Sequence, residues 1–141
     1  MSTNDDTELA QPPGGERRRE LWLQHAAGYI LFRDARRYAI DRLDPDLDES
    51  ARAAALRAID DALYGLMMIA DGVTGGLSNG ELTVSVRLVA RLERTEPDGT
   101  ITLAHELDLG PPDGDGMCMG YHGWREGDFG DDPILRVVRR E

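Results

Sequence analysis

The chain has 141 residues and a formal net charge of −11, because 27 acidic residues outnumber 16 basic ones. Its length fits one domain, and its charge opposes binding to nucleic acid. The single cysteine, Cys118, excludes an internal disulfide, and no stretch resembles a secretion signal or a membrane-spanning helix. The sequence therefore predicts a soluble cytoplasmic protein that acts away from membranes.

Residues 1–15 differ in composition from the rest of the chain. They are polar and acidic, and they end in Pro12-Pro13-Gly14-Gly15. Such a segment has too little apolar surface to offset the entropy lost on ordering. We expect a disordered acidic tail over residues 1–15 and a single α+β domain over residues 16–141.

Residues 16–43 predict a long helix, because they contain no proline and end just before Asp44-Pro45. The stretch from Leu21 to Phe32 is apolar nearly all round. A helix of that kind is either covered on several sides or placed in a subunit interface. The stretch therefore predicts the contact surface of a homodimer.

A second helix is expected to follow and to end near Ala70. Asp46, with Glu49 three residues later, resembles a capping box at its start. Gly72 stands where a left-handed residue commonly ends a helix. The short link at Asp44-Pro45 predicts that the two helices form an antiparallel hairpin.

Residues 81–109 predict a β-hairpin, since apolar and polar residues alternate on both sides of the turn Glu96-Pro97-Asp98-Gly99. A four-residue loop places Val86 opposite Leu109 and Arg87 opposite Asp108. Two strands alone are marginally stable, so residues 134–138 are expected to add a third. The expected fold is a helical hairpin on one face of this small antiparallel sheet.

Two glycine-rich loops flank the hairpin, from Asp71 to Gly80 and from Gly110 to Pro133. The start of the first strand and the end of the second lie at one end of an antiparallel pair. We therefore expect the two loops to form one neighbourhood that holds the functional site. The second loop is expected to be long and ordered but not helical, because it is rich in glycine and aspartate.

The leading functional hypothesis is a non-catalytic protein that acts by protein–protein interaction. Exposed aromatic side chains beside charges are typical of interface hot spots, and the second loop offers six such residues, Tyr121, His122, Trp124, Glu126, Asp128 and Phe129. The acidic charge favours a basic protein partner. An inhibitor or immunity-type protein that neutralises a basic partner would have this character.

The alternative hypothesis is a divalent-metal-binding module or a small metal-dependent enzyme. Its ligands would be the carboxylates of Asp71, Asp113 and Asp115, which suit calcium or magnesium. The resemblance to an EF-hand loop fails at Met117 and Trp124, where that pattern requires oxygen ligands. No other cofactor is expected.

Three further interpretations of the second loop are weaker. Cys118 and His122 would need a helical turn to bind a soft metal together, and Gly120 and Gly123 oppose one. A nucleophilic Cys118 has no obvious partner base, and the glycines at 114 and 116 resemble a phosphate loop without a following helix. The sequence therefore favours no catalytic residue and no reaction.

Overall fold

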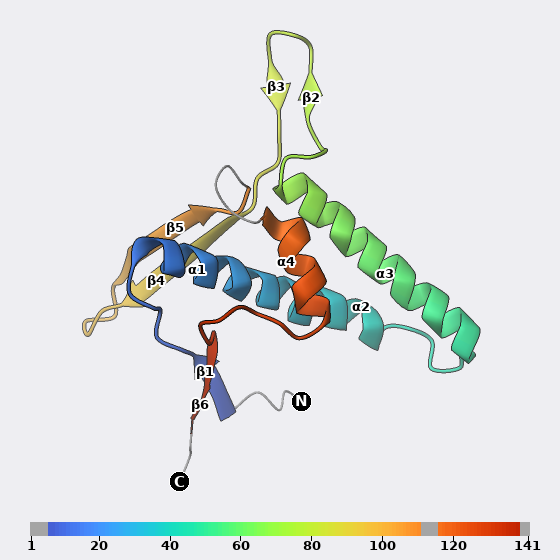
Figure 1. Cartoon of the computed structure of the whole chain (residues 1–141), viewed down its shortest axis with the longest axis horizontal. Coiled ribbons are helices and arrows are strands. Elements are labelled where there is room, and N and C mark those ends of the chain that lie inside the picture. Colours follow the sequence, from blue (N-terminus) through green and yellow to red (C-terminus); the bar gives the residue numbers. More distant parts are fainter. Residues whose placement is uncertain (1–5, 111–115, 139–141) are drawn as a thin grey trace.

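A computed structural model describes residues 6–110 and 116–138, and it is an α+β fold, as predicted (Figure 1). The helical elements are α1 (Glu16–Ile30), η2 (Leu31–Arg36), α2 (Arg37–Asp41), α3 (Glu49–Ala70) and α4 (Gly116–Arg125). The strands form three antiparallel pairs, β1 (Thr7–Leu9) with β6 (Leu135–Val137), β2 (Leu77–Ser78) with β3 (Thr83–Val84), and β4 (Val89–Thr95) with β5 (Ile101–Asp108).

The long first helix is confirmed, with α1, η2 and α2 following one another without a break. Its middle segment, η2, is a π-helix, whose wider turns rotate the faces of the flanking segments relative to each other. On this segment Phe32 lies against the ring of Tyr121 and Arg36 reaches the carboxylate of Asp60. Phe32 and Arg36, four residues apart on this segment, therefore reach one connected group, because the Tyr121 hydroxyl donates a hydrogen bond to the Asp60 carboxylate.

The second helix is also confirmed, but its capping residue differs from the prediction. Asp48 caps the helix, since its carboxylate accepts a hydrogen bond of 2.7 Å from the Ala51 amide. Asp46 instead belongs to a local turn, in which its backbone amide donates a hydrogen bond to the side-chain carboxylate of Asp44. Gly72 has a φ of 76°, as expected for a residue that ends a helix.

The helical hairpin is splayed rather than closely packed. Helix α4 lies between α1 and α3 and contacts both (Figure 1). Only α1 lies along the face of the β4–β5 pair, while α3 reaches the common core through its C-terminal end. The main core joins these elements through six buried residues, Met67, Ala70, Leu109, Met117, Tyr121 and Trp124.

The predicted hairpin exists, but its long first strand is divided into β3 and β4, and its register is wrong. Val89 stands opposite Asp108, and Leu109 donates a backbone hydrogen bond to Leu88 rather than pairing with Val86. A bulge at Leu92/Glu93 then shifts the pairing by one residue toward the turn. At the open end the error is two residues, so the strand keeps the predicted face toward the core.

Two features of the predicted hairpin hold despite this shift. Arg87 still forms an ion pair of 3.1 Å with Asp108, because its long side chain reaches diagonally across the strands. The turn is closed by Asp98, which accepts hydrogen bonds from Thr100, while Gly99 adopts a φ of 88°. Local turn chemistry was therefore a better guide than strand pairing.

The C-terminal strand does not join the hairpin. Strand β6 pairs with β1, and the amide of Ala10 donates to the carbonyl of Ile134. The prediction of a disordered tail is therefore wrong for residues 7–9, which form a strand; residues 1–5 lie outside the described residues. The polar composition of the tail concealed a three-residue strand whose stability comes from its partner.

The second loop contains helix α4, which the prediction of a non-helical loop excluded. Gly120 lowers helix propensity, but a Cβ at this position would approach the Trp124 ring to 2.6 Å. The missing side chain thus makes room for the indole of the same helix. Burial of Trp124 outweighs the conformational cost of glycine in this segment.

Candidate functional site

The described parts of the two glycine-rich loops meet at their bases. Asp71 contacts the start of α4, but Asn79 and Gly80 lie at the tip of the β2–β3 hairpin, which projects away from the body (Figure 1). At the other end, Phe129 packs against α1 and Asp132 binds Arg18. Among the described residues, the single neighbourhood predicted from hairpin geometry is therefore limited to the contact between Asp71 and α4.

Asp71 caps helix α4 from outside that helix. Its two carboxylate oxygens accept hydrogen bonds from the amides of Met117 at 2.6 Å and Cys118 at 2.9 Å. A carboxylate here satisfies amides that the helix leaves without partners and opposes the positive end of the helix dipole. Both carboxylate oxygens of Asp71 are therefore engaged by the start of α4.

The other two predicted metal ligands, Asp113 and Asp115, lie outside the described residues. Within residues 6–110 and 116–138, no three histidine, cysteine or acidic side chains gather closely enough to hold a metal ion. The phosphate-loop interpretation meets a different obstacle. A helix does follow the glycines, but its N-terminal amides are already bonded to the carboxylate of Asp71.

Replacing Asp71 with alanine is expected to lower the free energy of unfolding by about 1–2 kcal/mol, because two amides lose their partner at the start of α4. Amide exchange at Met117 and Cys118 should accelerate more than at other core positions. Asp61→Ala, an exposed position on α3, is the control and should change stability by less than about 0.5 kcal/mol. Equal stability of the two variants would show that the cap contributes nothing.

The predicted interaction residues divide into buried and exposed groups. Tyr121 and Trp124 are only 3% and 1% exposed, so they belong to the core and not to an exposed hot spot. Phe129 is half-buried and stacks on the Trp124 ring. His122, Glu126 and Asp128 are exposed, as an interaction surface requires.

Asp60 is a buried acid that sequence reasoning did not single out. Its carboxylate accepts hydrogen bonds of 2.8 Å from both the Arg36 guanidinium and the Tyr121 hydroxyl. Burial raises the pKa of Asp60, but these two hydrogen bonds and the positive charges of Arg36 and Arg125 together leave the pKa below its ordinary value. Burial and the Asp60 carboxylate together raise the pKa of Tyr121, so the hydroxyl remains a donor.

Cys118 is a poor nucleophile in this environment. Burial raises the pKa of its thiol, and the neighbouring Asp71 carboxylate raises it further. A thiol with a raised pKa holds little of the reactive thiolate at neutral pH.

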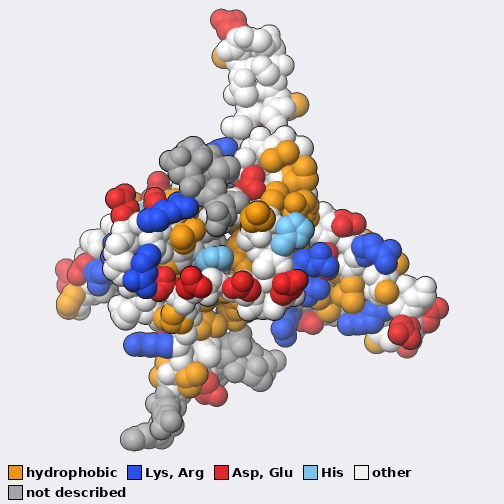
Figure 2. Space-filling model, in the orientation of Figure 1, with side chains coloured by type: hydrophobic (Ala, Val, Ile, Leu, Met, Phe, Trp, Pro, Cys, Tyr) orange, Lys and Arg blue, Asp and Glu red, His pale blue; other side chains and the backbone are white. Residues whose placement is uncertain are grey.

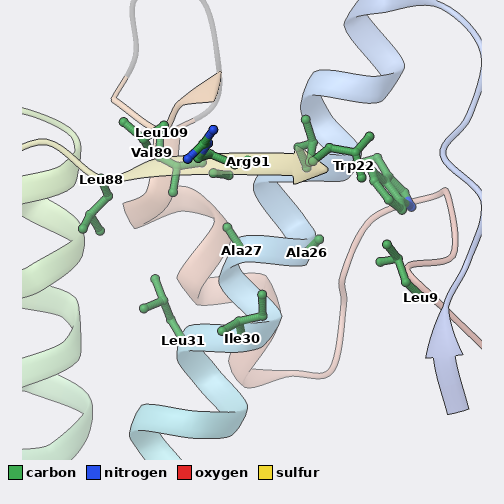
Figure 3. Close-up of a pocket in the computed structure, with 13 residues that line it drawn as sticks. Leu9, Trp22, Ala26, Ala27, Ile30, Leu31, Leu88, Val89, Arg91 and Leu109 are labelled. Carbon is green, nitrogen blue, oxygen red and sulfur yellow. The ribbon is translucent and has the colours of Figure 1, made fainter. Parts of the chain in front are cut away.

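An apolar cleft lies between helix α1 and strand β4 and has a volume of about 350 Å³ (Figure 3). Leu31 and Leu88 lie at one end of this cleft, Trp22 and Leu9 at the other, and Ala26 and Ala27 line its wall. Among the described residues that line it, every side chain except that of Arg91 is apolar. Ile30 projects into the cleft and is 52% exposed.

The cleft runs along an unpaired strand edge. Residues 88–92, five in a row, line the cleft. On the face of a sheet only every second residue would do so, and therefore the cleft follows the edge of the strand. Since Leu88 and Leu109 are hydrogen-bonded partners, the backbone groups of Val89 and Arg91 point away from β5. Among the described residues, no strand pairs with this edge.

The β2–β3 hairpin, here called the arm (residues 77–86), is the second exposed apolar feature. Leu77 stands opposite Val84, and alternation places Leu82 and Val86 on the same face. These four side chains are between 56% and 75% exposed. The arm stands clear of the body and carries an acidic tip (Figure 2).

Comparison with known proteins adds no function. None of the family models, curated proteins or solved structures compared with the chain matches it. In the part of the chain that the structure describes, every helix is too short or too polar to cross a membrane. The functional conclusion therefore depends on the geometry of the cleft and of the arm.

Proposed function

We propose that this chain is a non-catalytic interaction protein and that the cleft between α1 and β4 is its docking site. The cleft would accept an extended apolar segment of another polypeptide as an additional strand beside β4. The observation that carries this proposal is the combination of an apolar hollow with outward-pointing backbone groups at Val89 and Arg91. Main-chain hydrogen bonds supply affinity in such strand addition, and side-chain pockets supply specificity.

The chemistry of the site supports binding rather than catalysis. Its described walls are alanine, leucine, isoleucine, valine and tryptophan side chains, with the guanidinium of Arg91 as the one charged group among them. That guanidinium already faces Glu106 at 3.4 Å. A cytoplasmic location, which fits the single cysteine Cys118, is part of the proposal.

A second candidate surface suits the basic partner expected from the net charge. Four carboxylates occur within seven residues after α4, at Glu126, Asp128, Asp131 and Asp132, and the first three are exposed. A basic partner, such as one held by an inhibitor or immunity-type protein, would be attracted to this acidic segment. Binding there should weaken as salt is raised, whereas binding in the apolar cleft should not.

Capture experiments with matched variants test which surface is used. Ile30→Glu places a charge in the cleft at a half-exposed position, whereas Glu126→Gln with Asp128→Asn removes charge from the acidic segment. Loss of bound polypeptide with Ile30→Glu alone supports the cleft, and loss with the double variant alone supports the acidic segment. Unchanged capture with both variants contradicts the proposed function.

A further inference from the structure

We infer that the segment received by the cleft is the arm of a second copy of this chain, so that two copies form a closed dimer by exchanging strands. This inference rests on the proposed function of the cleft and names its occupant. The arm is a hairpin with only two paired residues on each side. A two-stranded hairpin of this size is marginal in water without further packing, so its apolar face requires a partner.

The backbone of the arm fits the open edge of β4. The amide of Asn79 donates to the carbonyl of Leu82, and therefore the backbone groups of Thr83 and Ser85 point away from β2. On β4 the outward-pointing groups belong to Val89 and Arg91. Each edge thus offers free groups on two residues spaced two apart, as antiparallel pairing between copies requires.

This hydrogen-bonding pattern also determines which side chains of the arm face the cleft. If Ser85 of one copy pairs with Val89 of the other, then Val84 lies beside Ala90 and Val86 beside Leu88, because directly opposed residues share a face. Ala90 and Leu88 line the cleft. The apolar face of the arm would therefore enter the apolar cleft, and the polar side chains of Thr83 and Ser85 would face outward.

Charge permits this contact between two acidic chains. Residues 72–86 contain a single charged residue, Glu81, in a protein of which 30% is charged. The cleft contributes Arg91, opposite in sign to Glu81. The proposed register also places Arg87 of one copy opposite Arg87 of the other, where each guanidinium keeps its ion pair of 3.1 Å with Asp108. Two copies of net charge −11 can therefore meet through this segment without bringing many carboxylates together.

The chain order makes the exchange reciprocal. Strands β3 and β4 are consecutive, so antiparallel placement of the first copy's β3 beside the second copy's β4 also places the second copy's β3 beside the first copy's β4. Such a contact is isologous and closes at two copies, rather than continuing into a filament. It also includes part of the helical stretch from Leu21 to Phe32 that the sequence predicts as a dimer surface.

Light scattering after size-exclusion chromatography, together with native mass spectrometry, tests the dimer. The wild-type chain should have twice the mass of one chain. Val84→Glu on the arm and Ile30→Glu in the cleft should each weaken dimerisation by about a hundredfold, because each buries an unpaired carboxylate. Ile101→Glu, an equally exposed apolar position near the hairpin turn, is the matched control and should remain dimeric.

Mixing the two interface variants gives the sharper result. The heterodimer of Val84→Glu with Ile30→Glu keeps one intact arm-and-cleft contact and should form more strongly than either variant alone. A monomeric wild-type chain, or a dimer unaffected by Val84→Glu, overturns this inference. If only Ile30→Glu dissociates the dimer, the cleft remains a docking site with a different occupant, and if neither variant does, the proposed function fails as well.

Discussion

Replacing Gly28 with alanine is expected to lower the free energy of unfolding by about 3 kcal/mol, at the upper end of overpacking effects. A Cβ at this position of α1 would overlap the indole ring of Trp124. The ring has no room to yield, because it is 1% exposed, stacks on Phe129 and donates a hydrogen bond of 3.0 Å to His25. Urea unfolding of wild type and variant measures the loss.

Gly65 provides the matched control for this substitution. It is also a helical glycine, but a Cβ there would meet nothing within 4 Å. Gly65→Ala should therefore raise stability by about 0.5–1 kcal/mol, since alanine is the better helix former. If Gly28→Ala were as stable as Gly65→Ala, the close packing of α1 on α4 would be disproved.

Replacing Asp60 with alanine is the second substitution with a large expected effect, a loss of about 3 kcal/mol. The variant leaves the Tyr121 hydroxyl buried without its acceptor and removes the carboxylate between Arg36 and Arg125. Asp34→Ala is the control, because its ion pair with Arg33 is exposed and should contribute less than about 0.5 kcal/mol. Thermal unfolding should show a large loss of stability for Asp60→Ala and little change for Asp34→Ala.

Asp60 should also contribute to acid sensitivity. The folded state holds the pKa of Asp60 below its ordinary value, so its stabilisation is present above the unfolded pKa of about 3.9 and is lost as pH falls through the lower folded pKa. Asp60→Asn should reduce this loss without abolishing it, because the pKa values of Asp98 and Asp108 are lowered as well. Identical pH profiles for wild type and Asp60→Asn would contradict this role.

Sequence reasoning succeeded where the signal is local. Asp44-Pro45 ended the first helix, Gly72 ended the second, and Pro97-Asp98-Gly99 formed the expected turn. These features depend on backbone preferences of a few neighbouring residues. They therefore require no knowledge of tertiary contacts.

The predictions were wrong where contacts between residues distant in the sequence determine the local structure. Helix α4 forms against the propensity of its glycines because Asp71 caps it and Trp124 packs on it. At the open end of the hairpin the register differs from the prediction by two residues, a shift that keeps the same apolar face toward the core. Neither the formation of α4 nor the pairing of β4 with β5 can be predicted from the residues next to them in the sequence.

The candidate site was predicted in part. The apolar stretch of α1 indicated a contact surface, and Ile30 and Leu31 from it do line the cleft. The other wall comes from β4, which the sequence placed in the sheet without indicating that its edge stays open. Tyr121 and Trp124, chosen as hot spots, are instead core residues, because composition alone does not distinguish a buried tryptophan from an exposed one.

Residue-resolved amide exchange at Val89 and Arg91 tests the docking role of the cleft most directly. Without a bound strand these amides point from an open edge and exchange fast; with a strand seated beside β4 they become hydrogen-bonded and slow. We expect slow exchange at both residues in the wild-type complex and fast exchange in Ile30→Glu. Equally fast exchange in the two proteins would contradict strand addition at β4.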